Sequence, residues 1–216
     1  MKILAFDTSA ESCSVALYSA GTCLEKMNIE PRKQAERLLP IIDSLLIEAG
    51  LRRSDLSGLA LTHGPGAFTG VRIAISAGQA IAYALDLPVV TVSTLAAIAQ
   101  GAHRKWGWQH VAVAVDARMD EVYWGCYQLS ESGLMEAVMP DAIARPETVQ
   151  LPVETPWRGA GSAWLVYREK IPNLAETHGL TIEAIDIISL ALPQFNQGNT
   201  IRAHDVKPVY LRNKVV

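Results

Sequence analysis

The stretch His63-Gly64-Pro65-Gly66-Ala67-Phe68-Thr69-Gly70-Val71-Arg72 decides how the first half of the chain is interpreted. It follows a short apolar run, 58–62, and opens a long apolar segment that ends at Leu85. This order predicts a strand, a glycine-rich turn and a helix, with Thr69 as the helix N-cap. Because free N–H groups at a helix start attract anions, one interpretation of the turn is a phosphate-binding loop that uses Gly64 and Gly66.

The spacing of the glycines favours a second interpretation. They fall at positions 64, 66 and 70, one residue longer than the G-x-G-x-x-G pattern. No Lys-Ser or Lys-Thr pair follows, which excludes a Walker A loop. We therefore expect a tight strand-to-helix connection and keep phosphate binding as the alternative.

The helix after this turn carries a ridge of small side chains. Gly70, Ala74, Gly78 and Ala82 recur every four residues and share one face. Such a ridge lets another backbone come close, either in the chain's own sheet or in another subunit. Both interpretations stay open, and under the second Gly78→Arg would block pairing while leaving the monomer folded.

A second amphipathic helix is predicted from Pro31 to Ala49, ending at Gly50. Leu38, Ile42 and Leu45 form its apolar stripe, and Ile41 widens that stripe beyond what one sheet face needs. A helix that is apolar on more than one side needs a second partner. We therefore predict a partner interface formed by Leu38, Ile41, Ile42 and Leu45 together with the small-residue ridge.

Composition excludes several classes of function. The chain has 216 residues and a net charge of −3, with 19 basic and 22 acidic side chains, which argues against nucleic-acid binding by the chain alone. Its three cysteines form no C-x-x-C motif and resemble reduced cytosolic thiols. The N-terminus lacks a signal-peptide core and no apolar run approaches a membrane span, so we expect a cytoplasmic protein without membrane contact.

The two halves of the chain begin in the same way. Three short strands are predicted over 2–29 and three more over 111–139, each set a meander whose first strand ends in an aspartate, Asp7 or Asp116. Strands alternating with helices follow, which predicts an α/β protein with mixed sheets. Asp7 and Thr8, like Asp116, can orient a phosphate or a metal-bound water, or can cap their own turn.

Five motifs, taken in order, resemble the bacterial TsaB family of threonylcarbamoyladenosine biosynthesis proteins. They lie at 3–9, 64–72, 92–95, 116–123 and 208–212, so the resemblance covers the whole chain. It implies an actin-like/Hsp70-like (ribonuclease H-like) fold of two domains, each beginning in a three-stranded meander. We place an N-terminal domain at 1–104 and a smaller C-terminal domain at 105–216, whose last segment can return to the first.

The resemblance also implies a function. The chain would be a noncatalytic accessory subunit that pairs with a TsaD-like catalytic subunit and a TsaE-like ATPase in modifying adenosine 37 of tRNA. It would reach tRNA only through that complex and form a homodimer when alone. It would need no cofactor of its own, with ATP or ADP and magnesium held only in the complex. The pairing surface would be the two helices described above.

Departures from the family pattern leave an alternative open. Ala67 replaces a serine of the family loop, and the histidines of this chain include no H-x-x-x-H pair. The alternative is an autonomous ATP-binding phosphotransferase using Asp7 and Asp116. A hydrolase is disfavoured because neither G-x-S-x-G nor H-E-x-x-H occurs.

A few further side chains are candidates for partner contacts or packing. Arg72 and Arg118 would either contact a ligand or form a salt bridge between the domains. Tyr210 and Arg212 would either contact a partner or dock the tail on its own domain. We expect the five tryptophans to serve core or hinge packing rather than base stacking.

Overall fold

The computed structural model describes residues 1–152 and 155–212. The chain forms two compact units, the first from 1–94 and 182–209 and the second from 95–181 and 210 onward. This division differs from the expected boundary between 104 and 105. The helix at 94–106, which crosses that boundary, belongs to the second unit from residue 95 on, and the helix at 184–197 belongs to the first.

The first unit is built on a five-stranded mixed sheet. Its strands, in the order β3-β2-β1-β4-β5, are β1 (Lys2–Asp7), β2 (Cys13–Ser19), β3 (Thr22–Asn28), β4 (Gly58–Thr62) and β5 (Val89–Val92). The pairs β1–β2 and β2–β3 are antiparallel, as expected for the meander, whereas β4 and β5 run parallel to β1. The expected opening meander is therefore present.

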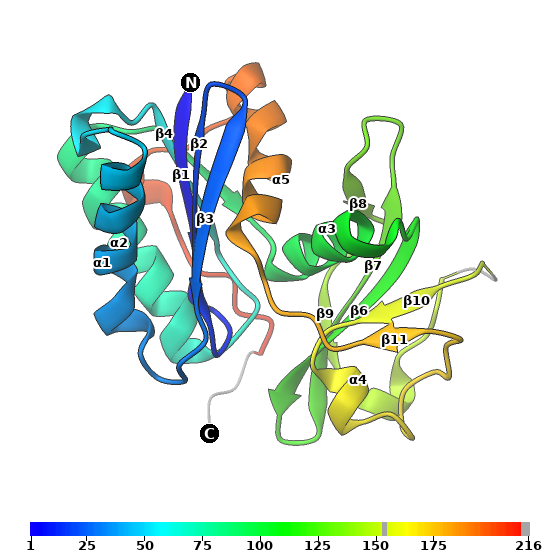
Figure 1. The fold of residues 1–216 in the computed structure, drawn as a ribbon. Coiled ribbons are helices and arrows are strands. Elements are labelled where there is room, and N and C mark those ends of the chain that lie inside the picture. The colour runs from blue at the N-terminus through cyan, green and yellow to red at the C-terminus, as the bar shows by residue number, and fades with distance from the viewer. Residues whose placement is uncertain (153–154, 213–216) are drawn as a thin grey trace. The chain divides into compact units, whose positions relative to one another are not determined.

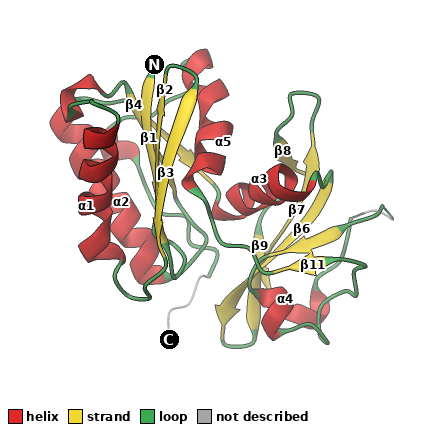
Figure 2. Ribbon diagram, in the orientation of Figure 1, coloured by secondary structure: helices red, strands yellow, loops and turns green. Residues whose placement is uncertain are grey.

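Three helices cover the two faces of this sheet. Helices α1 (Gln34–Glu48) and α2 (Phe68–Leu85) lie side by side on one face, and α5 (Ala184–Gln197) lies on the other (Figures 1 and 2). Because side chains alternate along a strand, Leu4 and Phe6 of β1 join the core under α1 and α2. Asp7 points to the opposite side at the end of the strand.

The second unit repeats this strand order. Its sheet, in the order β11-β10-β6-β7-β8, contains β6 (His110–Arg118), β7 (Glu121–Leu129), β8 (Met135–Ala137), β10 (Arg158–Ala160) and β11 (Thr177–His178), while β9 (Ala142–Ala144) also pairs with β7. Helices α3 (Thr94–Trp106) and α4 (Ala163–Val166) complete the unit, and short 3₁₀ turns lie at Arg53–Asp55, Pro146–Thr148 and Ala203–Asp205. Trp124, Trp157 and Trp164 pack in its core, as expected.

Helix starts differ from expectation at two places. Helix α1 begins at Gln34, three residues after Pro31, and α2 begins at Phe68 with Ala67 as its N-cap, so Thr69 does not cap it. Helix α5 continues through Pro193 to Gln197 and ends at Gly198, which adopts a left-handed conformation. Proline near the last turn of a helix removes only one hydrogen bond, and packing of the apolar face of α5 offsets that loss.

The small-residue ridge packs on the chain's own sheet. Ala74 and Ala82 are buried, and a β-carbon added at Gly78 would lie 3.0 Å from a methyl group of Leu61 in β4. A β-carbon at Gly70 would collide with the carbonyl oxygen of Thr8. The interpretation of this ridge as a free surface for another subunit is therefore wrong, because the first unit already occupies it.

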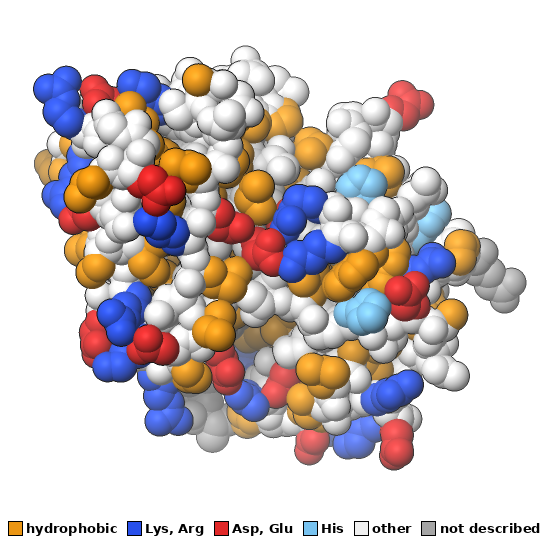
Figure 3. All heavy atoms as spheres, viewed as in Figure 1, with side chains coloured by type: hydrophobic (Ala, Val, Ile, Leu, Met, Phe, Trp, Pro, Cys, Tyr) orange, Lys and Arg blue, Asp and Glu red, His pale blue; other side chains and the backbone are white. Residues whose placement is uncertain are grey.

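The predicted stripe on α1 needs a similar correction. Leu38, Ile42 and Leu45 are at most 4% exposed and belong to the core of the first unit, whereas Ile41 is half-buried. The large hydrophobic side chains left exposed on α1 are Leu39, 54% exposed, and Ile47, 79% exposed. In the space-filling view hydrophobic side chains lie open over the part of the molecule where α1 runs (Figure 3).

Helix α2 is the one described helix that is long and apolar enough to cross a membrane by length and composition. The sequence expectation that no apolar run approaches this length is therefore too strict. One face of α2 packs on β4 through Gly78 and Ala74, which is the arrangement of a core helix on a sheet.

Candidate functional site

A fully buried carboxyl group of the first unit lies where β1 ends. The side chain of Asp7 is fully buried and accepts hydrogen bonds from the backbone N–H of Ser9 at 3.1 Å and from the Ser9 hydroxyl at 2.6 Å. The hydroxyl of Thr62, at the end of the adjacent parallel strand β4, also donates to it. Thr94 follows β5 and brings its hydroxyl to 3.4 Å from that of Ser9.

Residues 63–70 pack directly onto the residues at the end of β1, Asp7-Thr8-Ser9, which we call the Asp7 corner. The N–H of Ala67 donates to the carbonyl oxygen of Ser9 at 2.9 Å, and the Thr8 hydroxyl donates to the carbonyl oxygen of Gly70 at 2.7 Å. A β-carbon at Gly66 would lie 2.8 Å from that of Ser9. Gly64, with a φ of 105°, has the left-handed conformation that only glycine adopts readily. The turn thus fits against Asp7-Thr8-Ser9 at backbone distance.

This arrangement does not fit a nucleotide phosphate. Burial raises the pKa of the Asp7 carboxyl above its ordinary value, and the hydrogen bonds from Ser9 and Thr62 oppose part of that rise. The N–H groups of Ser9 and Ala67, which an anion would need, already donate to the chain's own oxygens. Asp7 therefore acts as the acceptor that holds its own turn, the second of the two roles considered from the sequence.

The corresponding corner of the second unit lies at the β6–β7 hairpin. Asp116 accepts hydrogen bonds from the Arg118 backbone at 2.8 Å and forms an ion pair with its guanidinium at 3.0 Å. Arg118, Met119 and Asp120 all have positive φ, between 55° and 62°. This Arg118 ion pair with Asp116 is local to the hairpin.

Arg212 fixes this hairpin from the C-terminal segment. Its guanidinium donates to the carbonyl oxygens of Ala117 and Arg118 at 3.0 and 3.2 Å and pairs with Glu121 at 2.5 Å. The tail is thus docked on its own unit, one of the two roles considered for it. Tyr210, two residues earlier, is 44% exposed.

The remaining candidate, Arg72, lies on the exposed side of α2. Its guanidinium carbon is 3.8 Å from the centre of the Phe68 ring, a cation–π contact one turn back along the helix. Within the described residues, no group of three or more His, Cys, Asp and Glu side chains is arranged to hold a metal ion. The contributions of Thr62 and Thr94 to the Asp7 corner were not predicted, although both follow strands that end at the same edge of the sheet.

These features define a class of protein. Two mixed sheets share one strand order, and each begins with a meander whose first strand ends in, or just beyond, an aspartate. That is the actin-like two-domain α/β fold expected from the sequence.

Comparison with known proteins defines the family. The family model of TsaD, tRNA N6-adenosine threonylcarbamoyltransferase, matches residues 28–188. The chain is 40% identical to the tRNA threonylcarbamoyladenosine biosynthesis protein TsaB of Escherichia coli, covering 100% of this chain and 96% of that protein, and 34% identical to TsaB of Haemophilus influenzae, covering 100% and 95%. This chain belongs to the TsaB family.

A solved structure shows the same fold throughout. YeaZ from Pseudomonas aeruginosa is 46% identical, with a TM-score of 0.94 over 97% of this chain and 99% of that one. Another Pseudomonas aeruginosa structure, described as similar to the peptidase YeaZ, gives the same identity and TM-score.

Proposed function

We propose that this chain is a noncatalytic accessory subunit in the biosynthesis of threonylcarbamoyladenosine in tRNA. It pairs with a TsaD-like catalytic subunit, works with a TsaE-like ATPase, and reaches tRNA through that complex in the cytoplasm. The full-length similarity to proteins named TsaB supports the pathway. The match to the TsaD family model supports a shared fold with the catalytic subunit.

The observation that carries the noncatalytic role is the packing of the 63–70 turn into the Asp7 corner. A phosphotransferase of this fold would need that corner for phosphate. In this chain the Thr8 hydroxyl, the Ser9 N–H and the Asp7 carboxylate bond to the chain itself. Opening the corner would break these hydrogen bonds, which is costly when their buried partners are left unpaired.

The pairing surface in this proposal is the outer side of α1 and α2, which on α2 lies opposite the predicted ridge. It is formed by Leu39, Ile47, Ala80, Tyr83 and Ala84, all exposed in this chain. Tyr83 is 83% exposed and Ile47 79%, the two largest exposed fractions among the large hydrophobic side chains of the described residues. Small residues beside them let a second helix approach closely. The same surface supports a homodimer when the catalytic subunit is absent.

The proposal is tested by co-purifying the chain with the TsaD-like protein, with and without ATP, and by assaying tRNA threonylcarbamoylation by the reconstituted set. Ala80→Arg should abolish both pairing and modification while the isolated chain stays folded. Asn196→Arg, an exposed position on α5 on the other face of the sheet, is the matched control and should change neither. Pairing that survives Ala80→Arg would exclude this surface.

A separate titration examines the alternative of an autonomous phosphotransferase. That enzyme would bind ATP in a magnesium-dependent manner without a partner, and Asp7→Asn would weaken the binding. We expect no magnesium-dependent ATP binding to the isolated chain.

A further inference from the structure

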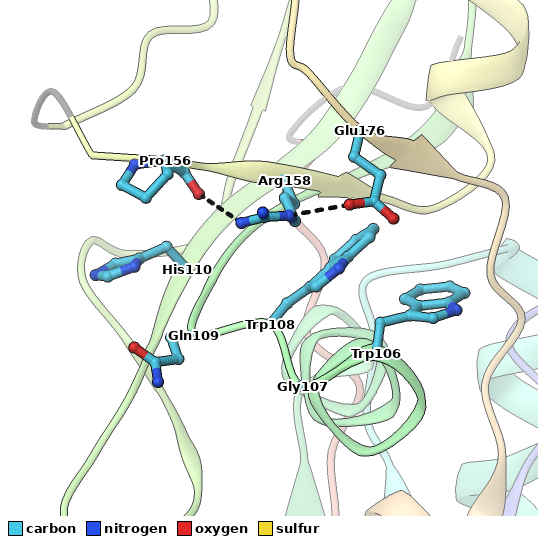
Figure 4. Close-up of a pocket in the computed structure, with 8 residues that line it drawn as sticks. All are labelled: Trp106, Gly107, Trp108, Gln109, His110, Pro156, Arg158 and Glu176. Atoms are coloured by element: carbon cyan, nitrogen blue, oxygen red, sulfur yellow. Dashed lines mark hydrogen bonds and ion pairs between the residues drawn. The ribbon is translucent and has the colours of Figure 1, made fainter.

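A hollow of about 450 Å³ in the second unit belongs to none of the features above. It lies where the end of α3 leads into β6, beside the starts of β10 and β11 (Figure 4). Its lining is Trp106, Gly107, Trp108, Gln109, His110, Pro156, Arg158 and Glu176. This volume falls within the range of pockets that hold small organic ligands.

One side of the hollow is aromatic. The rings of Trp106 and Trp108 lie 4.6 Å apart, and His178 of β11 packs 4.6 Å from Trp106 and 5.5 Å from Trp108. Trp106 is half-buried and lies outside the hydrophobic cluster that holds Trp124, Trp157 and Trp164. The expectation of core packing therefore does not account for Trp106.

The other sides carry hydrogen-bonding groups. Figure 4 shows the guanidinium group of Arg158 across the hollow, between Pro156 and Glu176, with Gln109 and His110 on the far side from Trp108. Arg158 bonds to Glu176 at 3.0 Å and to the Pro156 carbonyl at 3.3 Å, and Glu176 also contacts His178 at 3.2 Å. This ion pair is over one-third exposed on both sides, and such pairs add little stability.

The surroundings are basic although the chain as a whole is acidic. The last turn of α3 carries His103, Arg104 and Lys105, and three of the five histidines of the chain, 103, 110 and 178, lie on the segments around the hollow. Figure 3 shows basic and histidine side chains gathered over α3 and β11. A ligand suited to these surroundings is flat, has hydrogen-bonding edges and is negatively charged.

We propose that this hollow binds a nucleotide. The base lies beneath the Arg158 guanidinium and touches the small exposed part of Trp108, which is 5% exposed, with Gln109 and Glu176 at its polar edge, and the phosphate lies toward the basic end of α3. Aromatic rings and arginine planes are the surfaces on which unpaired bases stack. The nucleotide is either free or part of single-stranded RNA. This site is independent of the proposed pairing surface, which belongs to the first unit, and of magnesium.

The test follows the five tryptophan indole N–H signals by NMR in the full chain. The probes are AMP, an unstructured hexanucleotide RNA, and ribose 5-phosphate as a ligand without a base. We expect AMP or RNA to shift the signals of Trp106 and Trp108, assigned with Trp106→Phe, and to leave those of Trp124 and Trp164 in place. Magnesium should have no effect on the titration.

Variants assign the binding to this hollow. Arg158→Gln should weaken binding about tenfold, the usual effect of losing one stacking partner. Gln109→Glu, at an exposed position, should weaken it further by charge repulsion. Arg53→Gln is the matched control, because Arg53 forms an exposed ion pair with Asp43 in the first unit, and should leave binding unchanged. Circular dichroism checks that each variant is folded.

The outcomes separate the sources of the ligand. If the chain binds RNA more tightly than it binds AMP, and added salt weakens the binding of RNA, the result supports a site for an RNA nucleotide. Binding of AMP alone supports a free nucleotide. Equal shifts with ribose 5-phosphate, unmoved Trp106 and Trp108 signals, or an Arg158→Gln chain that binds as well as wild type would overturn the proposal.

Discussion

Thr8 and Gly70, 62 positions apart in the chain, are joined at backbone distance, with the Thr8 hydroxyl donating to the Gly70 carbonyl oxygen at 2.7 Å. A β-carbon at residue 70 would collide with the Thr8 carbonyl oxygen. The turn at 63–70 and the end of β1 are thus held together by the chain's own groups.

Gly70→Ala should destabilise the protein by about 2–3 kcal/mol, because the added carbon collides with a backbone oxygen that cannot move alone. Gly78→Ala is the matched control in the same helix. Its added carbon meets a flexible leucine methyl at 3.0 Å, and alanine favours the helix, so we expect a change within about 1 kcal/mol. Urea denaturation measures both. Equal losses in the two variants would contradict this account.

Gly78→Arg should unfold the first unit. The sequence interpretation of the ridge as an interface expects this variant to stay folded and fail to pair. Because Gly78 packs against Leu61, there is no space for a long charged side chain at position 78. We expect the variant to be insoluble or to lose its cooperative thermal transition, whereas Ala80→Arg keeps it. A folded, unpaired Gly78→Arg monomer would restore the original interpretation.

Arg212→Ala should loosen the β6–β7 hairpin, since the side chain holds two carbonyl oxygens and the Glu121 carboxylate. Amide hydrogen exchange over 117–121 should become about tenfold faster, the effect of losing one or two hydrogen bonds to a charged group. Arg212→Lys keeps the charge but lacks the planar fork of donors, so it should restore only part of the protection. Full protection in the lysine variant would show that charge alone is sufficient.

The three cysteines should react slowly in the folded protein. Burial raises the pKa of Cys13 and Cys126 to about 12 and that of Cys23 to about 11, so all three remain thiols at pH 8. Labelling with a thiol-specific reagent should be slow in buffer and reach three equivalents in denaturant. Cys23, the least buried, should react first. Rapid labelling of Cys13 or Cys126 would show that the cores open readily.

The buried carboxyl of Asp7 should make stability depend on pH. Because its pKa is raised in the folded state from 3.8, the folded protein holds this proton to higher pH than the unfolded chain. Its contribution to stability is therefore present below pH 3.8 and is lost as the pH rises through the folded value. The free energy of unfolding of Asp7→Asn relative to wild type should accordingly increase with pH over that window and then level off.

Asp120→Asn is the control for this measurement, because the Asp120 side chain is 82% exposed. It should show no such trend. If the stability of Asp7→Asn relative to wild type instead falls as the pH rises, the Asp7 pKa is lowered by folding rather than raised.

Local sequence patterns predicted most of the fold. The meanders, the turn at 63–70 and the helix after it were each specified by alternation or glycine placement within a few residues. The surface against which the small-residue ridge packs was not predicted. A helix face of small residues is equally suited to Leu61 of its own sheet and to another subunit. Only the tertiary structure decides between these two partners.

Only part of the candidate site was predicted, and the reason is the same. Asp7 and Asp116 stand at strand ends that the pattern reveals, whereas the donors from Thr62 and Thr94 depend on which strands become neighbours. The hollow beside Trp108 unites residues near 107, 157 and 176, and its assembly depends on β10 and β11 pairing beside β6. Separations of this size leave no periodic signal in a single sequence.

Helix α5 covers the first sheet, yet it is translated after nearly all of the second unit. Residues 1–94 therefore leave the ribosome with one sheet face uncovered. At about 5–20 residues per second, that face waits roughly 5–20 seconds for Ile187 and Ile188 to cover it. Early termination anywhere before residue 184 would release a chain that cannot complete its first core, which makes nascent and truncated forms of this protein natural clients for chaperones and proteases.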